Sequence, residues 1–115
     1  MFTHYYSERM IKMLNFVIAL EEGSKAQSTV DDKLIEDIAE GNMDALRKLY
    51  ETVHKTIYAF ALSITKNTHD AEDVLQETFL TIYNKAVNYK PQKKPMAWIF
   101  TIAKNLALMK LRYSA

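Results

Sequence analysis

The stretch Asp70–Leu80, DAEDVLQETFL, carries two patterns at once. On a helix that turns about 100° per residue, Asp70, Asp73 and Glu77 share one face and Gln76 lies beside them. The opposite face is apolar, and we expect it to pack into a core through Val74, Leu75, Phe79 and the following Ile82. The stretch therefore predicts an amphipathic helix with one strongly acidic side.

The acidic side has two explanations that the sequence leaves open. Asp70 and Glu72 stand in the first helical turn, where the helix dipole stabilises negative charge without any partner. Glu77 lies more than two turns further on, where neighbouring carboxylates only repel one another. A second protein that presents basic residues to this side would account for all of these acids together.

The composition around this stretch favours a small all-α protein. The chain has 115 residues, enough for one domain with a core, and it contains two glycines and two prolines. Sheet proteins need turn residues more often than that, so we expect a few long helices. The chain has no cysteine, which excludes disulfides and thiolate metal sites and fits a cytoplasmic location.

Hydrophobic periodicity predicts a helical bundle of about four to five helices, over residues 5–21, 30–40, 43–66, 68–87 and 95–112. Gly41 is placed to end the second helix, Thr68 to cap the fourth, and Pro95 to begin the fifth. In the third helix, apolar residues recur every three or four positions at Leu46, Leu49, Val53, Ile57, Phe60 and Ile64.

We assign residues 30–115 to the main domain and residues 1–29 to an N-terminal amphipathic helix and linker. The longest apolar run of that helix, Phe16–Leu20, is too short for a signal peptide or for a membrane span of about 20 residues. No membrane insertion is therefore expected. The sequence leaves three roles open for the apolar face of this helix: packing on the domain, covering one of its surfaces, or forming a dimer contact.

Charge is divided unequally along the chain, although the net charge is only +1. Residues 1–77 carry 14 acidic and 8 basic side chains, whereas residues 78–115 carry 7 basic side chains and no acid. A basic segment of this kind indicates a polyanionic partner for the C-terminal part alone, or else a solvated positive surface.

Aromatic residues are interleaved with this basic charge. Tyr89, Lys90, Lys93 and Lys94 precede the last helix, and Trp98 lies in its first turn. Lysines that bind phosphates and rings that stack on bases are typical of single-strand nucleic-acid binding, although Trp98 is equally suited to anchor a core. We expect Ile99, Ile102, Ala103 and Leu106 to face the core, and Phe100 and Leu111 to point away from its centre and to need a neighbouring helix or a partner.

No pattern indicates an enzyme, a cofactor or a metal site. Glu51 and His54 form a single E-x-x-H, whereas helical di-iron sites use two such pairs with further glutamates. The two glycines stand alone, so there is no glycine-rich phosphate loop. We expect a binding protein without catalytic activity.

Three segments together resemble region 2 of bacterial sigma factors, closest to the extracytoplasmic-function group. They are LIEDIAEGNMDALRKLYETVHKTIYAFALSIT, DAEDVLQETFL and PMAWIFTIAKNLALMKLR, all within Asp32–Arg112. The resemblance implies a domain that binds the RNA polymerase core and recognises and melts the promoter −10 element during transcription initiation. An anti-sigma factor is a further possible partner.

The resemblance also implies which residues serve each partner. The acidic helix would dock on the clamp helices of the polymerase β′ subunit through Asp70, Asp73, Gln76, Glu77 and Leu80. The loop and last helix would contact the non-template strand and the upstream fork of the −10 element through Tyr89, Lys90, Lys93, Lys94, Trp98, Thr101, Lys104, Asn105 and Leu108.

Two departures from the family keep an alternative open. The family commonly has an aspartate where this chain has Met109, and its second DNA-binding domain, which reads the −35 element, would lie beyond Ala115. The chain would then be either a fragment or an unusual short protein. The alternative is a sigma-like docking module that binds polymerase or an anti-sigma factor without recognising promoters.

Overall fold

The computed structural model describes residues 30–114, and within them the chain forms helices and no strand. The elements are α2 (Asp32–Ala39), α3 (Met43–Thr65), α4 (Thr68–Lys85), the short 3₁₀ helix η2 (Ala86–Asn88) and α5 (Pro95–Ser114). This confirms the all-α bundle and four of the five predicted helices. The helix predicted at 5–21 lies outside the described residues.

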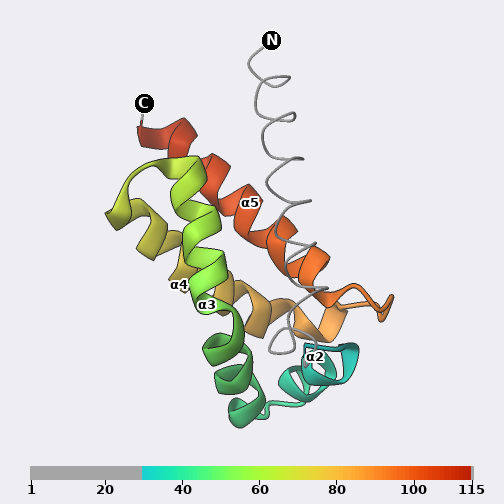
Figure 1. Ribbon diagram of the computed structural model, residues 1–115. Helices are drawn as coiled ribbons and strands as arrows, with labels where there is room; N and C mark the ends of the chain where they lie inside the picture. Colours follow the sequence, from blue (N-terminus) through green and yellow to red (C-terminus); the bar gives the residue numbers. More distant parts are fainter. Residues whose placement is uncertain (1–29, 115) are drawn as a thin grey trace.

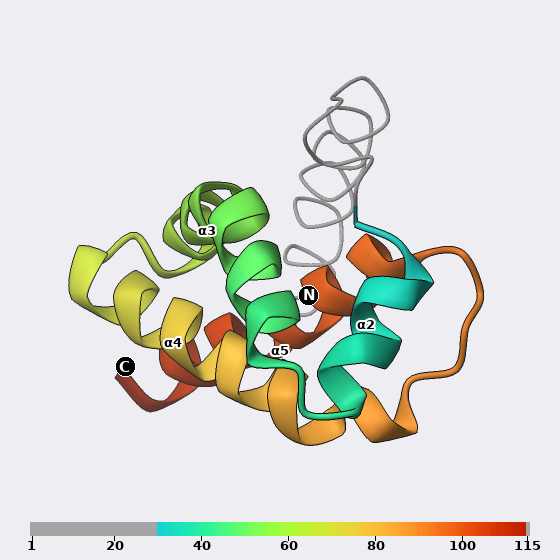
Figure 2. The ribbon, with the colours of Figure 1, turned by 90° about the horizontal axis from the view of Figure 1, so that it is seen from below.

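The three long helices pack on one another, and the short α2 closes one end of the bundle. Each of α3, α4 and α5 contacts the other two, while α2 contacts α3, α4 and η2 (Figure 1). This arrangement places the loop that precedes α5 next to α2 (Figure 2). Segments that are about 60 positions apart in the sequence therefore lie together.

Polar side chains at the helix N-termini explain where these helices begin. Asp31, Asn42 and Asn67 each accept a hydrogen bond from the backbone N–H three residues further on, at 2.9–3.1 Å. The prediction that Thr68 is the N-cap of α4 was wrong, since Asn67 has the extended backbone and makes the bond. Gly41 follows the end of α2 with a φ of 89°, a conformation that glycine adopts without strain.

The predicted core stripes of α3 and α4 are confirmed. On α3 the buried residues include Leu49, Val53, Ile57, Phe60 and Ile64, with Leu46 partly buried at the edge. On α4 the four residues predicted to face inward are all buried: Val74, Leu75, Phe79 and Ile82. These two faces form the core against which α5 packs.

The buried face of α5 differs from the predicted one. Phe100 is completely buried, and its ring meets Phe60 edge to face with centroids 5.1 Å apart. Ile102 and Leu106, predicted to be core residues, are only partly buried. The reason is that α5 contacts both α3 and α4, so its buried stripe is centred on Met96, Ile99, Phe100, Ala103 and Ala107. No helix within residues 30–114 is long and apolar enough to cross a membrane.

Candidate functional site

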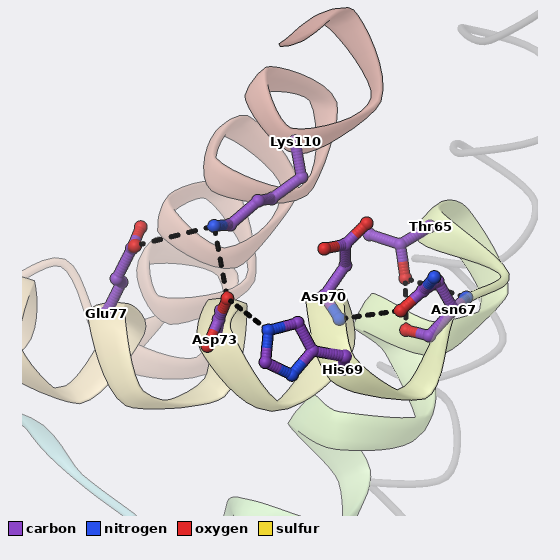
Figure 3. A network of polar contacts seen from close by, with 7 residues as sticks. All are labelled: Thr65, Asn67, His69, Asp70, Asp73, Glu77 and Lys110. Carbon is purple, nitrogen blue, oxygen red and sulfur yellow. Dashed lines mark hydrogen bonds and ion pairs between the residues drawn. The ribbon is translucent and has the colours of Figure 1, made fainter. Parts of the chain in front are cut away.

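The acidic face of α4 lies on the surface of the bundle, beside the last turns of α5. The Asp73 and Glu77 side chains are 35% and 48% exposed, so neither carboxylate is buried in the fold. Lys110 reaches them from α5, with its Nζ 3.3 Å from Asp73 Oδ2 and 3.9 Å from Glu77 Oε1 (Figure 3). His69 Nε2 lies 3.7 Å from the same oxygen of Asp73.

Lys110 supplies an intramolecular reason for the position of Glu77. One ammonium group between two carboxylates offsets the repulsion that the sequence alone left unexplained. An external basic partner is therefore not required to account for these acids, although both remain accessible to one. Because the three charges are half-exposed, solvent screens them, and their pairing contributes modestly to stability.

The other residues predicted for this surface surround the Asp73–Glu77 pair. Asp70 is half-buried one turn earlier, and Leu80 is 62% exposed one turn later. Gln76 lies on the opposite flank, where it lines a groove of about 420 Å³ between α3 and α4 together with Tyr50 and Tyr58. The acidic residues thus lie beside the end of α5, while Gln76 borders the groove toward α3.

The E-x-x-H motif on α3 is a local structural feature. The His54 Nδ1 lies 2.8 Å from the backbone oxygen of Tyr50, and the two rings stack with centroids 4.6 Å apart. Across residues 30–114, no three side chains of the types that bind metals come together in a way that could hold an ion.

A second surface is a groove beneath the loop between η2 and α5. Its volume is about 390 Å³, and its walls include five of the residues predicted to contact DNA: Tyr89, Lys90, Lys94, Trp98 and Thr101. The Tyr89 and Trp98 rings meet with centroids 4.9 Å apart and planes tilted by 56°. Trp98 is half-buried, so it packs against the core and borders the groove at the same time.

The remaining predicted DNA contacts lie beside this groove. Asn105 and Leu108 continue the side of α5 that carries Thr101, and Lys104 lies at its flank. Lys93 is in the loop itself, with a left-handed φ of 60° and an exposed side chain. The structure therefore brings the aromatic and basic residues to one side of the α5 N-terminus.

Asp32 of α2 holds this loop in place. Its carboxylate accepts a hydrogen bond from the Tyr89 hydroxyl and another, at 2.9 Å, from the backbone N–H of Lys93. The pKa of the Tyr89 hydroxyl is raised well above its usual range, mainly because the group is partly buried and also because it donates a hydrogen bond to Asp32. The neutral phenol is thus retained as a hydrogen-bond donor.

Sequence reasoning missed the roles of Asp32 and Lys110. Asp32 follows the N-cap Asp31, so it was interpreted only as an acid of the first helical turn. Lys110 was counted in the basic segment, and its spacing from Asp73 and Glu77 contains no local pattern. Both contacts depend on how distant helices pack, which a single sequence does not reveal.

Comparison with known proteins identifies the class to which this fold and these surfaces belong. The model of the sigma-70 region 2 family matches residues 49–115, more than half of the chain. The chain therefore belongs to the sigma-70 family and contains its region 2. Its relatives place it in the extracytoplasmic-function group, as the sequence resemblance predicted.

Three of these relatives show the extent of the similarity. The extracytoplasmic-function sigma factor SigM of Bacillus subtilis is 42% identical over 59 residues, which are 50% of this chain and 35% of SigM. SigW of the same bacterium is 29% identical over 80 residues, covering 70% of this chain and 43% of SigW. The sigma factor CarQ of Myxococcus xanthus is 32% identical over 79 residues, covering 69% and 45%.

The chain thus spans less than half the length of the curated relatives described above. No solved structure matches it.

Proposed function

We propose that this chain binds the RNA polymerase core through the acidic face of α4 and captures the non-template strand of the promoter −10 element in the groove of Tyr89 and Trp98. It would act in the cytoplasm, during transcription initiation. One observation carries the proposal, which is that a single bundle presents an acidic surface and a separate aromatic and basic groove. Membership in the sigma-70 family supports RNA polymerase core and promoter DNA as the partners of these surfaces.

The acidic face suits a basic partner of substantial size. Asp73 and Glu77 are half-exposed beside Leu80, so a helix that presents arginines could pair with the carboxylates while its apolar side chains cover Leu80. Such charge complementarity increases the rate and the specificity of association more than its strength. Lys110 would share the carboxylates with the partner, because each carboxylate has oxygens and lone pairs left to accept further hydrogen bonds.

The groove suits an unpaired base. Extracting a base from the stack costs a few kcal/mol, which stacking on a ring offsets by about 1–3 kcal/mol per base. Tyr89 and Trp98 provide the rings, and Lys90 and Lys94 lie within the same groove, where they can contact phosphates. No bond is made or broken by this chain, since the polymerase carries out the chemistry.

The two surfaces lie at different ends of α5, which allows both partners to be bound together. Trp98 and Lys110 are twelve positions apart, or about 18 Å along a helix that rises about 1.5 Å per residue. A rigid helix would therefore hold the opened strand at a fixed distance from the polymerase contact. The competing function is a docking module that uses only the acidic face.

Selection of single strands distinguishes these two functions. The chain and the polymerase core of its own bacterium are incubated with an oligonucleotide pool that has a randomised window, and bound strands are sequenced. The proposal predicts a motif that is absent when the core is used alone. The enriched strand and a scrambled version are then titrated into the isolated chain, whose single tryptophan is Trp98. Either the absence of an enriched motif, or equal fluorescence changes with the enriched and the scrambled strand, would support the docking module instead.

A further inference from the structure

The loop over the groove is attached to α2 through a single carboxylate. Asp32 Oδ1 accepts the hydrogen bond from Tyr89 Oη, and Asp32 Oδ2 accepts the one from the Lys93 backbone N–H. These contacts join residues 57 and 61 positions apart. Figure 2 shows the loop passing beside α2 on its way to α5. One side chain therefore holds both the first residue of the loop and a point near its end.

The Asp32 contacts are the ones that tie this loop to α2. Residues 90–94 are all exposed and belong to no helix. Backbone-to-backbone hydrogen bonds mark its borders, from the Tyr89 N–H to Ala86 and from the Trp98 N–H to Lys94. Inside the loop, the backbone of Gln92 and Lys94 also hydrogen-bonds the Tyr89 hydroxyl, the same group that Asp32 holds. Lys93 keeps a left-handed backbone, which is uncommon for a residue with a β-carbon. The Asp32 contact with the Lys93 N–H therefore supports a conformation that the sequence itself does not favour.

Asp32 is not needed to start α2. Asp31 is the N-cap residue, and its own side chain accepts the hydrogen bond from the Leu34 N–H at 3.0 Å. Asp32 is half-buried and directs its carboxylate to the loop. The role of Asp32 can thus be tested separately from the capping of the helix.

We propose that Asp32 is a positioning residue for the single-strand groove, which it arranges by holding Tyr89 against Trp98 and by fixing the loop backbone at Lys93. This inference rests on the proposed function of the groove. A segment that is ordered before its ligand arrives loses less conformational entropy on binding, so the affinity is higher. Without the carboxylate, the loop would lose the contact at Lys93 and the group that holds the Tyr89 hydroxyl to α2, so more of its ordering would have to occur when DNA binds.

The direction in which Asp32→Ala changes the affinity for DNA distinguishes a positioning role from an effect of charge alone. A carboxylate close to a phosphate-binding surface repels DNA, so an effect of charge alone would make Asp32→Ala bind DNA more tightly. Positioning predicts weaker binding in spite of the lost negative charge. Glu36→Ala is the matched control, because Glu36 is exposed on the same helix and its loss changes the net charge equally.

The test uses the full chain and an oligothymidylate of about twelve nucleotides, a length within the usual site size of single-strand binders. Three quantities are measured for wild type, Asp32→Ala, Tyr89→Phe and Glu36→Ala. They are the Kd for the oligothymidylate, the Trp98 emission without DNA, and the hydrogen exchange rate of the Lys93 amide.

We expect Asp32→Ala to raise the Kd about five- to tenfold, to change the Trp98 emission and to accelerate exchange of the Lys93 amide. Tyr89→Phe keeps the ring and the Lys93 contact, so its Kd should rise less. Glu36→Ala should leave the Lys93 amide protected and should bind DNA at least as tightly as wild type. Circular dichroism confirms that each variant is folded.

An unchanged or lower Kd for Asp32→Ala, or an unchanged exchange rate at Lys93, would overturn the inference. A wild-type chain that binds no oligothymidylate would contradict the DNA half of the proposed function, and with it any positioning role in binding. In that case, faster Lys93 exchange in Asp32→Ala would still show that the carboxylate holds the loop. The two failures are therefore distinguishable.

Discussion

Phe100 illustrates what a single residue contributes to this fold. It lies where α5 meets α3, fully buried and edge to face with Phe60. The sequence predicted a core face of α5 through Ile99, Ile102, Ala103 and Leu106, with Phe100 pointing away from the core centre, because a helix that is apolar on nearly all sides gives a weak periodic signal. Which face is buried was decided by the packing of two other helices against α5.

Replacing Phe100 with alanine should therefore lower the free energy of unfolding by about 3–5 kcal/mol, the usual cost of removing a buried aromatic ring. Urea unfolding followed by circular dichroism measures this change. Met109→Ala is the control, since Met109 lies on the same helix with 48% exposure and its loss should alter stability by about 0.5 kcal/mol or less. A cost below about 1 kcal/mol for Phe100→Ala would contradict the observed core.

Helix α4 has three distinct sides. One side is buried against α3 and α5, a second borders the groove with Gln76 and Tyr50, and a third meets Lys110. The buried side and the acidic side could be predicted from helical spacing. The contact of the acids with Lys110 could not, because it joins residues 37 positions apart.

Helix boundaries show the same limit. The ends of α2 and α3 follow from residues that act locally, such as Asp31, Asn42 and Gly41, so a sequence reader can place them to within a residue or two. The predicted N-cap of α4 is one residue too late, because Asn67 and Thr68 are adjacent and both residue types are good N-caps. Beside the groove, Asp32 accepts a hydrogen bond from the backbone N–H of Lys93 in a distant loop, a contact that no local rule predicts.

The ion pairs between α5 and α4 should make a small contribution to stability. We expect Lys110→Gln to lower the free energy of unfolding by about 1 kcal/mol or less, because the ammonium and both carboxylates are half-exposed. A double-mutant cycle with Asp73→Asn, measured by urea unfolding at low and high salt, isolates the pair. A coupling energy above about 2 kcal/mol, or one that is insensitive to salt, would contradict this assignment.

At the scale of the whole molecule, the division of charge along the sequence is only partly a division in space, since Lys110 lies against Asp73 and Glu77, and Asp32 holds the basic loop. The basic residues at positions 90, 93 and 94 lie in or beside the groove, whereas the acidic face of α4 adjoins the far end of α5. The sequence predicted both surfaces and their chemistry. Their separation along α5 became apparent only from the fold.

This arrangement predicts a strong salt dependence for DNA binding. For single-stranded DNA, each lysine–phosphate contact adds about 0.7 to the magnitude of the slope of log K against log salt concentration. Replacing Lys90, Lys93 and Lys94 with glutamine should therefore reduce the magnitude of this slope by about 2. Titration of the oligothymidylate at several salt concentrations measures it. Glutamine at Lys33 and Lys48, exposed lysines of α2 and α3, should leave the slope unchanged. An unaltered slope in the triple variant would show that the loop lysines do not contact phosphates.

The central claim is that the acidic face of α4 binds polymerase, and retention of the chain on immobilised RNA polymerase core tests it most directly. Reversing Asp73 and Glu77 to lysine should abolish retention. Adding Lys110→Glu restores opposite charges between α4 and α5, so this triple variant separates lost binding from lost stability.

The matched control carries Glu36→Lys on α2 and Glu40→Lys at its C-cap, an equal charge change at exposed positions. We expect wild type and this control to be retained on the polymerase core, and the double and triple variants of α4 not to be retained. Retention of the folded triple variant at the wild-type level would contradict the claim.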